Sequence, residues 1–472
     1  FGIHNVSAMA NWTRRINANN SELENRREDW VGRVTYNFAE RYFFEANGAY
    51  NGSQKFSPNN RFVFFGSGAL GWAVSEEPFM KYLKTKGIID IFKIRGSIGE
   101  IGDDNAGARW AYLTDWSVVG PYKMSLDGSN SPFTGYKEST IATEDLRWAV
   151  VLKKNIGVDY SFLNNMIAGS FDLFRDKRTD IIIAGDQRAS VPSYFGASPP
   201  TANLGIVNSR GYELEVRLNK TFNNGIRAWL NASMTHAVNE VKFRDDPALK
   251  PDYQKNAGHA LGQVTTYIDH GNLSSWDDVI GSTAWNTGNE AKLPGDYVIL
   301  DFNGDGVVNT EDKAPYQYST TPQNTYNASF GIEWKGLSIF AQFYGVKNVS
   351  RYVKYPTFRS TAHVAYDEGE YWTVGGSATN PTPRWGTTID ECADGTRYLY
   401  DGSYVRLKNV EIAYTMKGNW LKKAGINTFR IYLNGNNLFM WSKMPDDCER
   451  GSSGDGVYPT MRRFNLGFDI TL

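Results

Sequence analysis

A twelve-residue segment in the middle of the chain has the spacing of a calcium-binding loop. Gly306 stands at the sixth position, where such loops turn sharply, and oxygen-bearing side chains surround it. The last position holds Asp instead of the Glu of a standard EF-hand, which resembles the dockerin variant of the loop. The alternative is an Asn- and Gly-rich turn that binds nothing. We expect a structural calcium ion, or another hard divalent cation, bound by Asp301, Asn303, Asp305, the carbonyl of Val307, Asn309 through water, and Asp312.

Tryptophans in the segments that lack a strand pattern are the second candidate site. Their flat faces can stack on sugar rings or on peptide side chains, although packing within loops is the simpler interpretation. The candidates for contact with a substrate or with a covering protein are Trp110, Trp116, Trp276, Trp285, Trp372 and Trp385.

The sequence contains no arrangement typical of an enzyme. The five histidines have neither metal-ligand spacing nor a neighbouring nucleophile, and no phosphate-binding glycine loop is present. The acidic pairs at 103–104, 277–278 and 446–447 are interpreted as solvated loop residues. We therefore expect no catalytic residues.

Composition limits the class of protein further. The net charge of −1 argues against nucleic-acid binding, which requires a basic surface. Aromatic residues reach 14% although the mean hydropathy is −0.46. No apolar run approaches the roughly 18 residues of a membrane-spanning helix, but strands that cross a membrane alternate and give a weak hydropathy signal.

Alternation with a period of two is the dominant pattern. In residues 30–38, Trp30, Val34, Tyr36 and Phe38 alternate with polar residues, and a tight turn at 39–41 leads into a second alternating segment. The same device recurs at 155–173, 212–234, 326–343 and 464–472. Each hairpin has one apolar face and one polar face.

The links between these segments alternate between short and long. Short links are expected near 39–41, 163–165, 220–225 and 335–336, and short helices near 76–90 and 416–426. Long links are expected near 100–150, 176–209, 238–323, 347–402 and 439–461. Such asymmetry is typical of outer-membrane barrels with periplasmic turns and extracellular loops. A soluble β-sandwich is the less favoured alternative, because it has no reason for the asymmetry.

The alternating segments and their links together predict an all-β fold, a transmembrane antiparallel β-barrel. Counting the segments gives about 14 strands of about ten residues in this chain. The calcium-type loop then lies in the extracellular segment 238–323. Cys392 and Cys448 fall in successive long loops on the outer side, where a disulfide is expected and two free thiols are the alternative.

An ordered series of segments resembles SusC/RagA-type TonB-dependent outer-membrane transporters, a Bacteroidetes-type family. The segments cover nearly the whole chain, at 25–30, 40–42, 71–77, 93–99, 208–213, 404–409 and 434–438. Such transporters have a plug and about 22 strands, so the resemblance covers the C-terminal portion of the barrel, residues 1–472. The N-terminal plug is not visible in this chain, which implies either a fragment or one piece of a split transporter.

The resemblance implies active import of a large nutrient, an oligosaccharide or an oligopeptide, across the bacterial outer membrane. It implies as partners a SusD-like surface lipoprotein that acts as a lid, and the TonB complex acting through the missing plug. The resemblance also implies that outer-membrane lipid surrounds the barrel. It leaves undecided whether two transporter–lid pairs form a dimer. The alternative is a passive porin or another outer-membrane barrel without energised transport.

Overall fold

The computed structural model describes residues 2–18, 24–105, 110–119, 135–192, 194, 199–352, 372–378, 395–444 and 460–472. No helix among these residues is long and apolar enough to cross a membrane. Within the described parts of the chain, fourteen strands form one sheet, in agreement with the expected number. In sheet order they are β1 (His4–Asn17), β2 (Asn25–Phe38), β3 (Tyr42–Ser53), β4 (Phe62–Ala73), β5 (Ile89–Asp103), β8 (Ala149–Phe162), β9 (Ile167–Ile183), β10 (Ala202–Thr221), β11 (Arg227–Phe243), β18 (Asn324–Trp334), β19 (Leu337–Lys347), β22 (Tyr404–Met416), β23 (Thr428–Ser442) and β24 (Arg463–Thr471).

The chain divides into two compact units. Unit 1 comprises Phe1–Leu214 and Ala237–Ala260, and unit 2 comprises Glu215–His236 and Leu261–Leu472. In unit 1, β1 to β5, β8 and β9 pair antiparallel in succession. In unit 2, the start of β11 and strands β18, β19, β22, β23 and β24 do the same.

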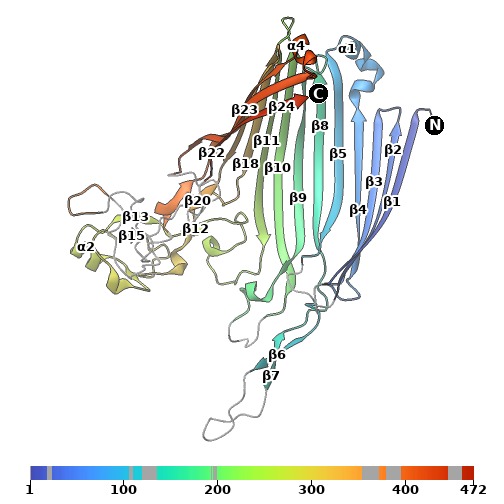
Figure 1. The fold of residues 1–472 in the computed structure, drawn as a ribbon. Coiled ribbons are helices and arrows are strands. Elements are labelled where there is room, and N and C mark those ends of the chain that lie inside the picture. Colours follow the sequence, from blue (N-terminus) through green and yellow to red (C-terminus); the bar gives the residue numbers. More distant parts are fainter. Residues whose placement is uncertain are drawn as a thin grey trace. The chain divides into compact units, whose positions relative to one another are not determined.

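Short links and long links leave opposite ends of the strands in each unit. In unit 1 the helical turn with η1 (Val74–Glu76), η2 (Pro78–Met80) and α1 (Lys81–Thr85) lies at one end, and the hairpin of β6 (Asp115–Val119) and β7 (Gly135–Thr140) lies at the other (Figure 1). In unit 2, α4 (Asn419–Lys423) lies at the short-link end (Figure 1). The predicted alternation of links is therefore present in both units.

Small elements fill the long links. In unit 2 these are β12 (Thr265–Thr266), β13 (Asp269–Asn272), α2 (Trp276–Gly281), β14 (Ala284–Trp285), η6 (Asn289–Ala291), β15 (Tyr297–Ile299), β16 (Val307–Val308), η7 (Thr310–Asp312), β17 (Ala314–Pro315), β20 (Ser350–Tyr352), η9 (Thr396–Tyr398) and β21 (Leu399–Asp401). In unit 1 they include η3 (Gly185–Gln187) and η5 (Asp252–Gln254). A core of buried aromatic and aliphatic side chains, Tyr267, Trp285, Tyr297, Ile299, Val308 and Tyr398, holds the unit 2 elements together.

The apolar face of unit 1 carries two rows of aromatic residues. Trp12, Trp30, Tyr50 and Phe64 are register partners across β1 to β4, and Phe38, Tyr42 and Trp72 form a second row. From position 30 to position 38 a strand rises about 26 Å at roughly 3.3 Å per residue. This spacing matches the two aromatic girdles that border an apolar band of about 25 Å in outer-membrane barrels. Large apolar side chains between and around the rows face outward, and Leu70 is 66% exposed.

All strands of the large sheet except β24 are longer than the expected ten residues. They range from 9 residues in β24 to 20 residues in β10. On the apolar face of β8 and β9, Ile156 pairs with Leu173, whereas Lys154 pairs with Arg175 one step nearer the long links. The pairing therefore continues past the apolar band into charged, water-exposed sequence, which the alternation of apolar residues alone does not mark.

Candidate functional site

Four side-chain amides form a hydrogen-bonded ladder across the polar face of unit 2. Gln342 on β19 donates its Nε2 to Asn327 Oδ1 on β18 at 3.0 Å. Asn409 on β22 donates to Gln342 Oε1 at 2.6 Å, and Asn436 on β23 donates to Asn409 Oδ1 at 2.5 Å. Because each inner amide uses one N–H and one carbonyl lone pair, each keeps one donor and one acceptor for a ligand.

Charged residues continue this polar face towards the short-link end. Arg430 on β23 forms ion pairs with Glu411 on β22 and with Asp469 on β24, the latter at 2.8 Å. Asn465 donates to Asn434 at 2.7 Å between β23 and β24. The polar face thus offers neutral and paired groups, which suit a polar ligand without a fixed charge.

The polar face of unit 1 is organised around Arg95 on β5. Its guanidinium reaches Asp159 on β8 at 3.2 Å and Asp172 on β9 at 2.7 Å. Arg95, Gly157 and Asp172 are register partners, so the arginine passes over Gly157, where a Cβ would come within 2.5 Å of Asp172 Oδ1. A side chain at 157 would therefore disrupt the ion pair.

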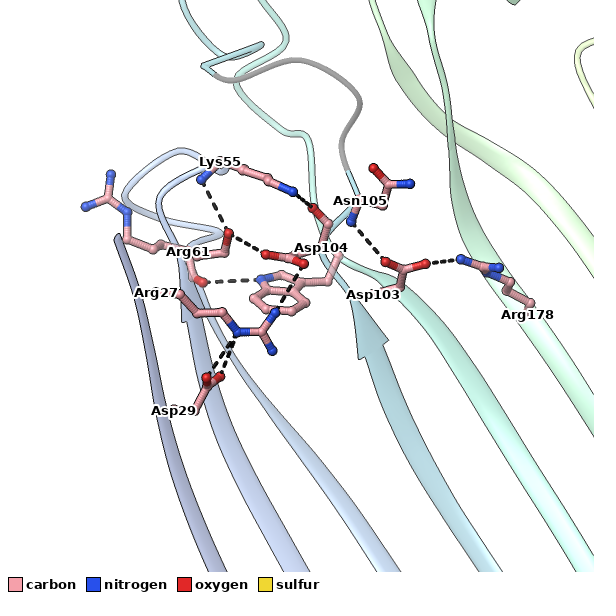
Figure 2. Close-up of polar contacts among 10 residues, drawn as sticks. Arg27, Asp29, Lys55, Arg61, Asp103, Asp104, Asn105 and Arg178 are labelled. Carbon is pink, nitrogen blue, oxygen red and sulfur yellow. Dashed lines mark hydrogen bonds and ion pairs between the residues drawn. The ribbon is translucent and has the colours of Figure 1, made fainter. Parts of the chain in front are cut away.

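A cluster of polar contacts fixes the long-link end of unit 1 (Figure 2). Asp104 accepts hydrogen bonds from Ser53 Oγ at 2.8 Å and from Arg27 Nη1 at 3.2 Å, while its main-chain carbonyl accepts from Lys55 Nζ at 3.1 Å. Its neighbour Asp103 pairs with Arg178 on β9. The expectation that this acidic pair is solvated is wrong, because the two carboxylates join the end of β5 to β2, β3 and β9.

A hydrophobic core lies beneath this polar cluster. Trp148 is 1% exposed, with its ring centroid 5.4 Å from Phe56 and 5.8 Å from Phe65. Its Nε1 donates to the Arg61 carbonyl at 3.2 Å, and the Arg27 guanidinium lies 5.7 Å from its ring (Figure 2). The base of the long link between β5 and β8 is therefore firmly anchored.

Glu77 anchors the short-link end of unit 1 to the aromatic row of Tyr42 and Trp72. It is 8% exposed and accepts hydrogen bonds from Tyr42 Oη at 2.6 Å and Trp72 Nε1 at 3.0 Å. These bonds, that from Tyr42 first, hold the pKa of Glu77 below its usual value of 4.5. The helical turn is thereby tied to the membrane boundary.

The predicted calcium loop folds around its carboxylates. Asp301 accepts from the main-chain N–H groups of Gly304 and Gly306 at 2.7 and 2.8 Å, and both glycines have positive φ, 75° and 88°. Asp312, which is fully buried, accepts from Phe302 N and Asn309 N, both at 2.8 Å.

The oxygen donors of this loop are of the type that hard cations prefer, and the glycine turn has the expected conformation. Among the described residues, however, no three His, Cys, Asp or Glu side chains are gathered closely enough to hold a metal ion. The carboxylates of Asp301 and Asp312 accept hydrogen bonds from main-chain N–H groups. To bind a cation, these carboxylates must direct their remaining lone pairs towards it.

The tryptophan candidates divide by exposure. Trp116 on β6 and Trp276 on α2 are each 59% exposed and can meet a ligand or a partner. Trp285 is 4% exposed inside the core of the long link, so its burial assigns it the packing role that was the simpler interpretation.

Two further tryptophan candidates are in contact with the chain or partly buried. The ring of Trp372 lies against Gly295, where a Cβ would come within 2.9 Å of it, and Trp110 is partly buried with a φ of 56°. Trp385, Cys392 and Cys448 lie outside the described residues.

Reasoning from the sequence missed the amide ladder, Arg95 and the Asp104 cluster. Several of these residues stand in the segments that carry the family resemblance, among them Arg27, Arg95, Asn409 and Asn436. A polar residue at alternate positions of a strand was a usable signal, but the partners depend on register between strands distant in sequence.

Comparison with known proteins gives a consistent picture. No family model matches the chain. The chain is 26% identical to TonB-dependent receptor P3 of Formosa agariphila, over 93% of this chain and 45% of the relative. It is 24% identical to TonB-dependent receptor SusC of Bacteroides thetaiotaomicron, over 93% of this chain and 43% of the relative. The structure of the RagAB peptide transporter superposes with a TM-score of 0.73 at 18% identity, covering 95% of this chain and 48% of the other.

The sheet, its girdles and these relatives define a β-stranded protein of the bacterial outer membrane. In sequence and fold the chain is similar to SusC/RagA-type TonB-dependent receptors. It spans less than half the length of the curated relatives it matches.

Proposed function

We propose that this chain forms part of the wall of a transporter that actively imports a large nutrient, an oligosaccharide or an oligopeptide. The observation that carries the proposal is the amide ladder of Asn327, Gln342, Asn409 and Asn436 on the polar face. Hydroxyl groups of sugars and main-chain amides of peptides both match its remaining donors and acceptors. The family of TonB-dependent receptors supplies the expectation of energised transport.

Uptake by cells tests this proposal directly. Labelled oligosaccharides and oligopeptides are offered to cells that contain the complete receptor, with and without a protonophore. Energised import stops when the proton gradient collapses, whereas diffusion through a passive porin, the alternative function, continues. Uptake that survives both the protonophore and loss of TonB would refute the proposal.

The proposed partners are a SusD-like surface lipoprotein above the long links and the TonB complex on the periplasmic side. Trp116 and Trp276 support the first part, because exposed tryptophans are enriched at protein interfaces. Purification from native outer membranes, with identification of the co-purifying chains, tests for the lipoprotein. The mass of the intact complex distinguishes one transporter–lid pair from a dimer of pairs.

We also propose that calcium braces the long link of unit 2 through residues 301–312. The donor chemistry and the glycine conformations support this role, which is structural and not catalytic. Isothermal titration of the chelator-treated receptor with calcium tests it, and absence of saturable binding would refute it.

A further inference from the structure

A pocket of about 840 Å³ opens at the short-link end of unit 2. It lies where the β18–β19 turn meets the end of β22 and the start of α4, the helix at that end in Figure 1. Its lining combines cationic and aromatic side chains, namely Arg227, Lys335 and Lys417 with Trp334, Tyr414 and Trp420. None of these groups belongs to the polar ladder or to the calcium loop.

The walls of the pocket are held in place by the chain itself. The two-residue turn at Lys335 and Gly336 has φ values of 47° and 91°. Thr415 N donates to the Gly336 carbonyl at 2.8 Å, and a Cβ at 336 would come within 2.5 Å of the Thr415 carbonyl oxygen. The tip of the β18–β19 hairpin is thus fixed against β22, and the pocket is largely preformed.

The pocket carries uncompensated positive charge. Arg227 faces Glu333 at 3.5 Å, which offsets its charge. Lys335 and Lys417, by contrast, form no ion pair with any carboxylate among the described residues, and Lys335 Nζ lies 5.2 Å from the centroid of the Trp334 ring. Two lysines beside exposed aromatic rings suit a phosphate attached to an apolar body.

The position of the pocket indicates the nature of the apolar part of the ligand. Trp334, Leu337 and Tyr414 are register partners on the apolar face, the face that meets lipid. Trp334 and Tyr414 are 44% and 46% exposed, and Trp420 is 64% exposed at the level of α4. Short links lie on the periplasmic side of outer-membrane barrels, so the pocket stands at the boundary between the inner leaflet and water.

We propose that this pocket binds the headgroup of an anionic phospholipid of the inner leaflet. The phosphate is held by Lys335 and Lys417, and the glycerol and acyl region runs along Leu337 and Tyr414. Such a lipid fixes the periplasmic rim of the sheet in the membrane. The inference depends on the outer-membrane location and not on which nutrient is imported.

Native mass spectrometry of the complete detergent-purified receptor tests the proposal with phosphatidylglycerol, phosphatidylcholine and inorganic phosphate as separate ligands. The test variant combines Lys335→Asn with Lys417→Gln, because Asn tolerates the positive φ at position 335. The matched control combines Lys137→Gln with Lys242→Gln, two exposed lysines on the long-link side with the same loss of charge.

An interfacial lysine contributes roughly a fivefold change in affinity for anionic lipid, so the double variant should bind phosphatidylglycerol about 25-fold more weakly. The control variant and the thermal stability of both variants should stay unchanged. Equal retention of phosphatidylcholine, unaltered affinity in the test variant, or displacement of phosphatidylglycerol by inorganic phosphate alone would overturn the proposal. The last outcome would indicate a site for free phosphate.

Discussion

Replacing Trp148 with alanine should loosen the long-link end of unit 1 more than any surface substitution there. The side chain is 1% exposed and packs against Phe56 and Phe65. Removing a buried tryptophan costs about 3–5 kcal/mol, because apolar contacts are lost and a cavity is left. The Arg61 carbonyl also loses the hydrogen bond from Nε1, so the upper part of this range applies if no water enters.

Hydrogen exchange is the appropriate assay, because a protein of this size in detergent does not unfold in a single step. The amide of Ser53 donates to the Arg61 carbonyl at 3.1 Å and reports on the opening of this cluster. Even the lower limit of about 3 kcal/mol corresponds to exchange that is faster by roughly 150-fold. Trp148→Phe, which refills most of the volume, should produce a much smaller change.

Trp116→Ala serves as the matched control, since Trp116 belongs to the same unit and is 59% exposed. Exchange at Ser53 should be unaffected by it. If Trp148→Ala and Trp116→Ala have equal effects at Ser53, the core does not anchor the cluster and the reasoning is refuted.

Three further predictions concern other parts of the chain. Calcium at about 100 times its dissociation constant should stabilise the receptor by about 2.7 kcal/mol in a thermal melt, and Asp301→Asn should abolish the shift, while an equal shift in the variant would place calcium elsewhere. Burial raises the pKa of Asp246, but hydrogen bonds from Asn256 and Ala257 outweigh it and leave the pKa below the usual 3.8. The protection from hydrogen exchange that Asp246 gives to these two amides should therefore persist above pH 3.8 and disappear as the pH falls through the lowered pKa of Asp246. Asp246→Asn should remove this pH dependence. Hydrogen-exchange rates corrected for intrinsic exchange measure both effects. Asn409→Leu breaks the amide ladder at its centre and should reduce nutrient uptake about tenfold, the equivalent of one hydrogen bond of 1–1.5 kcal/mol, with unchanged amounts of receptor in the membrane.

Much of the fold followed from the sequence because the membrane imposes simple rules on strands. Alternating residues such as Trp30 and Val34 predicted a sheet with one apolar face, and the short link at 335–336 predicted a tight hairpin. The ends of the strands were less predictable, since pairing beyond the apolar band needs no apolar residue. Lys154 and Arg175 pair there with the same main-chain geometry as Ile156 and Leu173.

The candidate site was less predictable, because its geometry depends on a bulge. The register between β19 and β22 shifts so that Phe343 pairs with Leu407 and Gln342 pairs with Asn409, which leaves Lys408 as an extra residue. Simple alternation would place Leu407 and Asn409 on the same face. The bulge places them on opposite faces, and this change of phase brings Asn409 into the ladder.

The same bulge explains how β22 satisfies two environments. Before the bulge, Val405 and Leu407 occupy odd positions on the apolar face, and after it Ile412 and Tyr414 occupy even positions on that face. If side chains alternated strictly through Lys408, Asn409 would lie on the lipid side and Ile412 on the polar side. Burying a polar amide in lipid without its partners is costly. Deleting Lys408 would make Leu407 and Asn409 neighbours in the chain and leave them on opposite faces, so the variant should still insert and keep Asn409 on the polar face. A bulge that re-aims side chains in this way sets the boundary between the membrane wall and the polar face that we propose contacts the nutrient.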